Sequence, residues 1–137
     1  MSATEHVDAV LARLREHADL APRVFEGVAD ENDDGSPRTR YVTVWANSGR
    51  RTVGRYTGPQ DVETYTFTVH SVSQVPSDVR VLADAVMQQL LGFVPAIDGR
   101  VCRRITHEVS EPLQYDRDLT PPLYWAAAEF DLISDPA

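Results

Sequence analysis

Alternation of apolar and polar residues marks 63–72 as a strand with one buried face. Within it, Tyr65, Phe67 and Val69 point one way and the intervening residues, mostly threonine, point the other. A period of two in β-branched and aromatic residues is typical of a half-buried strand. The period then changes, because apolar residues recur three and four positions apart over 79–90, which predicts a helix with one apolar stripe. A strand followed directly by such a helix is the nucleus of an α+β layer.

Capping residues predict where the helices begin and end. Ser77 is the expected N-cap of the second helix, Asp78 suits the positive end of its dipole, and Gly92 stands where a left-handed C-terminal cap falls. An earlier helix is predicted from the capping-box pattern at residues 2–5. We expect Pro22 to end that first helix.

Three further strands complete the predicted order α-β-β-α-β-β. Residues 41–46 are apolar on both faces, 100–110 alternate too irregularly for a fully buried strand and fit an edge, and 123–133 form the last strand. We therefore expect one α+β domain over 1–137, with a mostly antiparallel sheet and helices packed on one face. Long loops are expected at 26–40, 47–61 and 111–122.

The apolar residues divide into an expected core and an expected exposed set. One helix–sheet core is predicted from Leu11, Leu14, Phe67, Val69, Leu82, Val86, Leu90 and Phe130. Apolar area exposed on the second face of the sheet is expected at Val42, Val44, Val72, Trp125 and Ala127. Contiguous exposed apolar area on a small soluble domain usually marks a protein interface.

Composition narrows the classes of function. The net charge of −8 argues against tight, non-specific binding of nucleic acid, which needs basic groups to neutralise phosphates. The single Cys102 excludes an internal disulfide. No apolar run approaches the roughly 18 residues of a membrane span, and the first ten residues lack the basic region of a signal peptide. We therefore expect a soluble domain made in the cytoplasm.

No catalytic, metal or cofactor-binding constellation is visible in the sequence. His70 and His107 both fall on predicted strands and could be neighbours, although half-exposed strand residues are the favoured interpretation. Cys102 has no helix N-terminus or fixed base beside it to activate the thiol. The acidic segment 30–38 resembles a calcium loop only loosely, because no Glu stands at the twelfth position, and a solvated loop is favoured.

Four stretches, in order and over nearly the whole chain, carry a resemblance of pattern to a known family. They are VDAVLARLREHADLAPRVFEG, YVTVW, ETYTFTVHSVSQVPSDVRVLADAVMQQLLG and YWAAAEFDLI. In this order the chain resembles the tail terminator, or tail completion, proteins of long-tailed bacteriophages. The resemblance implies a virion subunit that forms a hexameric ring at the head-proximal end of the tail, stops growth of the tail tube and joins tail to head. It implies no catalytic residues and no cofactor, and it names the tail tube protein and the head–tail connector protein as partners.

Two groups of residues are hypothesised to make the contacts of such a ring. A subunit or tube interface is assigned to Arg50, Arg51, Arg55 and Trp125, the arginines lying on a long arm in an otherwise acidic chain. An acidic lining of the channel, through which DNA passes without tight binding, is assigned to Asp30, Glu31, Asp33 and Asp34, with the 111–118 loop as another source of carboxylates.

Three alternatives remain open at the level of sequence. A neck or head-completion protein of the same virion would share the size, acidity and ring symmetry. A small-molecule-binding α+β domain or enzyme would need a pocket with convergent polar groups, for which His70 and His107 are the candidates. A regulatory or toxin–antitoxin interaction protein is a further alternative. The terminator is distinguished from the neck protein by its gene, which is expected just upstream of the tail tube gene.

Overall fold

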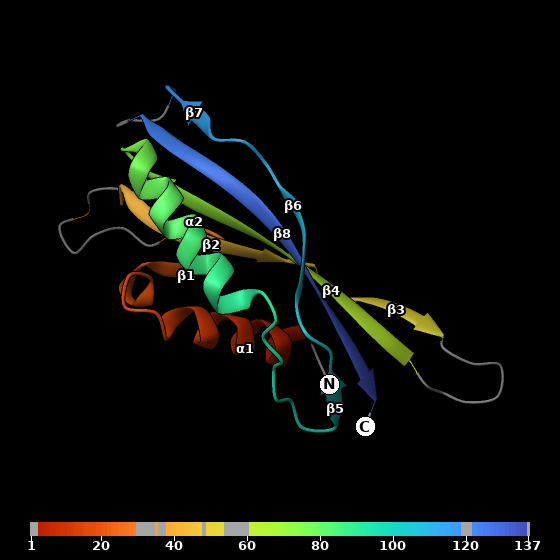
Figure 1. The fold of residues 1–137 in the computed structure, drawn as a ribbon. Coiled ribbons are helices and arrows are strands. Elements are labelled where there is room, and N and C mark those ends of the chain that lie inside the picture. The colour runs from red at the N-terminus through yellow and green to blue at the C-terminus, as the bar shows by residue number, and fades with distance from the viewer. Residues whose placement is uncertain are drawn as a thin grey trace.

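The computed structural model describes residues 3–29, 35, 38–47, 49–53, 61–118 and 122–136. Within these residues the chain forms helices and the strands of one sheet (Figure 1). In chain order they are α1 (Ala3–Arg15), the 3-10 turn η1 (Ala21–Arg23), β1 (Val24–Glu26), β2 (Arg40–Ala46), β3 (Arg50–Val53), β4 (Asp61–Ser73), α2 (Pro76–Leu90), β5 (Arg100–Cys102), β6 (Thr106–Ser110), β7 (Gln114–Asp116) and β8 (Leu123–Pro136). The α+β class and the order of the main elements are confirmed.

Two long antiparallel strands, β4 and β8, form the centre of the sheet. They pair without interruption from Glu63 opposite Ser134 to Ser73 opposite Tyr124. The path across the eight described strands is β1-β2-β4-β8-β5, with β3 added to β4, and β6 and β7 added to β8. The β1–β2 pair is parallel and every other described pair is antiparallel. The mostly antiparallel sheet that the sequence predicts is therefore confirmed.

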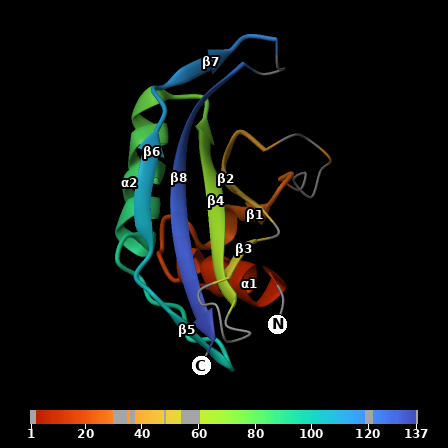
Figure 2. The same ribbon diagram turned by 90° about the vertical axis from the view of Figure 1, so that its right-hand side faces the viewer.

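Both helices pack on the same side of the β4–β8 ribbon (Figure 1). The core lies between this layer and the inward residues of the sheet, and Figure 2 shows α2 running alongside β8. All eight residues predicted for the core belong to one buried cluster, which confirms the periodicity of both the strand and the helices. Phe67, Phe130, Leu14, Leu82 and Leu90 are among its largest fully buried side chains.

The start of α2 differs from the prediction by two residues. The N-cap is Val75, and Pro76 occupies the first turn, where its missing N–H leaves no donor unsatisfied. The Ser73 hydroxyl accepts a hydrogen bond from the Val75 N–H and donates one to the Asp78 carboxylate, each at 3.3 Å. Ser77 is therefore not the cap. Gly92 follows the last turn with a φ of 80°, so the predicted left-handed residue at this end is confirmed.

Helix α1 ends earlier than Pro22, the residue expected to end it. The helix stops at Arg15, and the amides of the following residues bond back only three positions, as in the bond from His17 N to Leu14 O of 3.2 Å. This tightening directs Leu20 into the core, where its side chain is fully buried. Burial of this large apolar side chain therefore offsets the helical turns that the segment gives up.

The segment expected as one strand over 100–110 is two edge strands with a break at 103–105. Ile105 lies in the break, is buried, and exchanges backbone hydrogen bonds of 2.9 Å with Gly92 and Phe93. These bonds dock the chain beneath the end of α2 and interrupt the ladder with β8. The predicted edge position is confirmed. The loops expected at 47–61 and 111–122 each contain a short described strand, β3 and β7.

A buried polar cluster joins α1, β4, β5 and β8 at one end of the sheet. The His6 ring stacks on Tyr65 with ring centres 4.2 Å apart, and its Nε2 lies 3.0 Å from Ser134 Oγ. Arg100 donates to the same hydroxyl at 2.9 Å and to the Ser134 carbonyl at 2.6 Å, and its guanidinium lies 3.8 Å from Glu63. The Tyr65 hydroxyl donates to the Glu63 carboxylate. Mutual satisfaction of these groups makes their burial tolerable.

Candidate interaction surface

The sheet presents a second face that no described helix covers. Alternate residues of β2, β4 and β8 point to it, and the register aligns them in rows across the three strands. One row joins Thr43, His70 and Ala127, and the neighbouring pairs are Trp45 with Thr68 and Val72 with Trp125. We call this surface the helix-free face. Its described members on these strands are Tyr41, Thr43, Trp45, Thr64, Thr66, Thr68, His70, Val72, Trp125, Ala127, Glu129, Asp131 and Ile133.

An aromatic row occupies the middle of the helix-free face. The His70 ring lies between two indoles, with centre-to-centre distances of 6.5 Å to Trp45 and 5.3 Å to Trp125. Trp45 is 48% exposed, and its Nε1 donates to Thr43 Oγ1 at 3.2 Å. Burial lowers the pKa of His70, and the carboxylate of Glu111 opposes that shift. The row is an apolar, largely uncharged strip at neutral pH.

A shallow hollow of about 230 Å³ lies beside this row. Gly27 forms part of its wall and lies under the Trp45 indole, with a φ of 72° that an L side chain rarely adopts. The Gly27 N–H bonds to the Val44 carbonyl at 2.9 Å and so extends the β1–β2 ladder by one residue. Val28, the next residue of the wall, is 80% exposed. The hollow therefore has apolar and aromatic walls.

Carboxylates lie beyond the aromatic row on the same face. Glu129 stands opposite Thr68 and Asp131 opposite Thr66, whose hydroxyl donates to the Asp131 carboxylate at 2.9 Å. The described residues of β4 and β8 that point to this face include no arginine, and the chain has no lysine. The helix-free face thus combines an exposed indole with the carboxylates of Glu129 and Asp131, which form no ion pair within the described residues.

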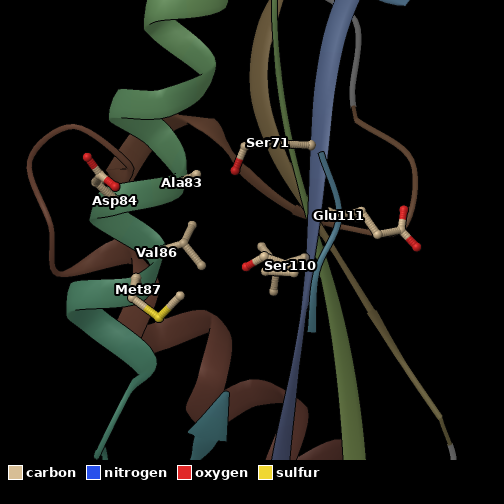
Figure 3. A pocket seen from close by; sticks show the side chains of 11 residues that line it. Ser71, Ala83, Asp84, Val86, Met87, Ser110 and Glu111 are labelled. Carbon is tan, nitrogen blue, oxygen red and sulfur yellow. The ribbon is translucent and has the colours of Figure 1, made fainter. Parts of the chain in front are cut away.

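A groove of about 190 Å³ separates α2 from β8 and β6 on the other side of the sheet (Figure 3). Val86 and Met87 of the helix face Ser110 and the two alanines of β8 on this side of the sheet, Ala126 and Ala128. Figure 3 shows the Glu111 carboxylate directed away from the helix, so titratable groups do not converge on this groove. The groove is lined mainly by small apolar side chains.

His70 and His107 do not come together. His70 points to the helix-free face, whereas His107 pairs with Phe130 of the core side, with ring centres 5.5 Å apart. The Nε2 atom of His107 lies 2.8 Å from Ser110 Oγ.

Burial raises the pKa of the Cys102 thiol. The hydrogen bond with Ser134 and the positive charge of Arg100 lower this pKa, but they offset the effect of burial only in part. Among the described residues, no three His, Cys, Asp or Glu side chains are grouped so that they could hold a metal ion. None of the described helices is long and apolar enough to span a membrane.

The residues predicted as an interface are only partly visible in the structure. Trp125 lies on the helix-free face, and Arg50 and Arg51 lie in β3, opposite Thr64 and Glu63 of β4. The remaining predicted residues, Arg55, Asp30, Glu31, Asp33 and Asp34, lie outside the described residues. The interface and channel assignments therefore remain predictions.

The predicted set of exposed apolar residues is largely wrong. Val42 and Val44 point into the core and are fully buried, and Val72 and Ala127 are also buried. The exposed indole is instead Trp45, which the predicted exposed set did not include. Sequence reasoning thus missed the exposure of Trp45 and the position of His70 between the two tryptophans. The only signal for this arrangement was the spacing of aromatic residues on strands whose register was unknown.

Comparison with known proteins gives a likeness of fold. No protein-family model matches the chain, and no curated protein sequence matches it. A solved chain described as "Virion of native gene transfer agent (GTA) particle" aligns with 93% of this chain and 92% of its own, with a TM-score of 0.68 and 13% identity. A second solved chain, which carries no functional name, aligns over 98% of this chain and 96% of its own, with a TM-score of 0.61 and 14% identity. This chain therefore shares its fold, over nearly its whole length, with a component of a virion particle.

Proposed function

We propose that this chain is a structural protein of a phage-like virion and acts as its tail terminator. The observation that carries the proposal is the likeness of fold to a chain of the gene transfer agent virion, which extends over nearly the full length of both chains. The order of elements that resembles the terminator family supports the finer assignment. The described residues contribute no converging catalytic groups, which favours a structural role over an enzymatic one.

A terminator occupies the growing end of a tube to which subunits would otherwise keep adding. Such a subunit needs one side that imitates the next ring and another that does not propagate. The present fold has two dissimilar sides, a helix-covered layer and a bare sheet face with exposed indole. In the proposed ring this asymmetry distinguishes the contact with the tail tube protein from the contact with the head–tail connector protein. The ring lies at the head-proximal end of the tail and assembles in the host cytoplasm.

The negative charge fits a channel through which DNA moves. Six copies at −8 each carry 6 × −8, or −48, in the proposed hexamer. With few basic groups to displace its counterions, DNA slides along such a lining without sticking. We assign part of this lining to the acidic 30–34 segment. Free subunits should accordingly show no sub-micromolar binding to duplex DNA at physiological salt, and such binding would contradict the channel assignment.

Loss of this protein tests the function directly. In a lysate of an amber mutant of the producing phage, electron microscopy is expected to show DNA-filled heads without tails, together with tubes of uncontrolled length. Normal-length tails attached to heads would refute the terminator role. Correctly sized but unattached tails beside heads that leak DNA would instead identify a neck protein, since tube length would then be controlled elsewhere.

A further inference from the structure

We propose that the helix-free face is the docking site for the arginine-bearing arm, residues 47–60, of a second copy of this chain. The inference rests on the ring assembly of the proposed function and names the contact that builds it. Neither the groove beside α2 nor the core cluster takes part. The site consists of the aromatic row Trp45, His70 and Trp125 and the carboxylates of Glu129 and Asp131.

The chemistry of this face selects a guanidinium. The planar cation of arginine stacks on an indole and bonds to carboxylates in bidentate fashion, and both kinds of acceptor lie within one face here. Trp45 is 48% exposed, and within the described residues Glu129 forms no ion pair. Asp131 holds one described hydrogen bond, from Thr66, which leaves acceptor capacity on its carboxylate. The face therefore offers two ways of binding arginine that its own chain does not use.

The same sequence supplies a segment with the complementary charge. The arm NSGRRTVGRYTGPQ contains Arg50, Arg51 and Arg55 and no carboxylate, in a chain whose net charge is −8. Several other arginines are engaged within their own chain: Arg13 with Glu16, Arg100 with the buried cluster, and Arg103 with Asp135. The arm is thus the chain's own basic segment and matches the acidic, aromatic face.

The described part of the arm leads away from the aromatic row of its own subunit. Its strand, β3, pairs with the far end of β4, with Arg50 opposite Thr64, whereas Trp45 stands opposite Thr68 and Trp125 opposite Val72. At roughly 3.3 Å per residue, Arg50 therefore lies about 13 Å along β4 from the level of Trp45 and about 26 Å from the level of Trp125. Because β3 is antiparallel to β4, each residue from Arg50 to Val53 leads farther from the row. The contact with the indoles is therefore assigned to the arm of another copy.

In a ring, the arm of each copy contacts the face of the next, so the contact between copies is heterologous. Each copy donates one arm and receives one, and such head-to-tail contacts form a closed ring where the rotation per subunit closes. This arrangement explains how one basic arm and one acidic face in each chain suffice for a ring. It also predicts that the contact weakens as salt rises, because part of it lies between charges at the surface.

Two half-site variants of the full chain test the contact. The face variant is Glu129→Arg, and the arm variant carries Arg50→Ser, Arg51→Ser and Arg55→Ser together. The control is Asp84→Arg, which makes the same change of charge on the exposed side of α2, in the opposite layer. Mass photometry and sedimentation velocity are expected to show rings for the wild type and the control, and monomers for each half-site variant. An equimolar mixture of the two variants should stop at dimers, since one intact arm meets one intact face and neither end can extend.

Tryptophan fluorescence provides a second, local readout. The two tryptophans of the chain both lie on the helix-free face, so their emission reports this surface alone. A synthetic 47–60 peptide added to the arm variant should change the emission saturably, and Glu129→Arg in that background should weaken the peptide at least about tenfold. The triple Arg→Ser peptide should have no effect. Dimers in the mixture, and the peptide response, also show that the variants are folded.

Three results would overturn the inference. Rings formed by either half-site variant would show that the contact lies elsewhere, while the amber-mutant test of the terminator role would stand unaffected. A wild-type chain that stays monomeric and ignores the peptide would refute docking of a second copy. Rings that persist in the Glu129→Arg variant but no longer bind tail tubes would assign the face to another virion protein.

Discussion

A methyl group added at Gly49 should destabilise the protein far more than one added at Gly92. Both glycines adopt a positive φ, of 91° and 80°, so alanine costs about 1–2 kcal/mol of backbone strain at either position. Their surroundings differ. A Cβ at Gly49 would stand 2.7 Å from Cε1 of Tyr65, whereas a Cβ at Gly92 would meet nothing within 4 Å.

The Tyr65 ring has no room to withdraw from that contact. It is 2% exposed, it stacks on His6 at 4.2 Å, and its hydroxyl is held by Glu63. The backbone at Gly49 is also fixed, because Asn47 Oδ1 accepts hydrogen bonds from the Gly49 N–H at 3.2 Å and the Thr66 N–H at 3.1 Å. Overpacking of this kind typically adds about 1–3 kcal/mol. The total expected for Gly49→Ala is therefore about 2–5 kcal/mol, against about 1–2 for Gly92→Ala.

Urea unfolding followed by far-ultraviolet circular dichroism measures both free energies of unfolding. The Tyr65→Leu background gives the decisive control, since leucine lacks the clashing atom. There, Gly49→Ala should cost only about as much as Gly92→Ala, a coupling of about 1–3 kcal/mol in a double-mutant cycle. If Gly49→Ala and Gly92→Ala differ by less than about 0.5 kcal/mol in the wild-type background, the packing of Gly49 on Tyr65 is wrong.

The remaining predictions concern the core, a histidine and the thiol. Phe67→Ala should cost about 3–5 kcal/mol and Leu90→Ala about 2–5, measured by chemical unfolding, because both side chains are fully buried; losses below about 1 kcal/mol at both would contradict the assigned core. The lowered pKa of His70 means that the unfolded chain binds a proton at this residue more readily than the folded chain, so the free energy of unfolding should fall as pH drops below about 6.5. The decrease of the free energy of unfolding with falling pH should be smaller in His70→Gln. An unchanged pH dependence in that variant would show that His70 is not its source. Cys102, buried and with a raised pKa, should react with a disulfide reagent at least about a hundredfold more slowly in the native protein than in urea, and equal rates would contradict its burial.

Long, periodic elements were predictable because their signal is local. The alternation over 63–72 and the helical spacing over 79–90 each report one buried face without reference to the rest of the chain. The eight residues that share these faces or pack against them form one cluster in the structure. Burial of apolar area dominates folding, so a pattern repeated over three turns or five alternations is rarely overridden.

The bounds of the short strands were not predictable because three to five residues carry too little periodicity. Strands β5, β6 and β7 all pair with β8. Their existence depends on partners that lie between 7 residues (Asp116 and Leu123) and 36 residues (Arg100 and Pro136) away in sequence, and on Ile105, which docks beneath α2 and breaks the ladder. A tertiary contact thus decides where these edge strands begin and end, and local propensity does not encode it.

The exposure of Trp45, unlike the interface role assigned to Trp125, escaped prediction because a strand that is apolar on both faces has two possible orientations. In YVTVWA, either Val42 and Val44 or Tyr41 and Trp45 could face the helices, and alternation alone does not choose. The structure shows the choice that packing density favours. Val42 and Val44 stand opposite Ser71 and Val69 beneath the helix layer, where small β-branched side chains fill the space without voids. Indoles at those positions would overpack a core that already holds Phe67 and Phe130. The same choice that closes the core therefore directs Trp45 outward beside His70 and creates the aromatic face assigned here to a second copy of the chain.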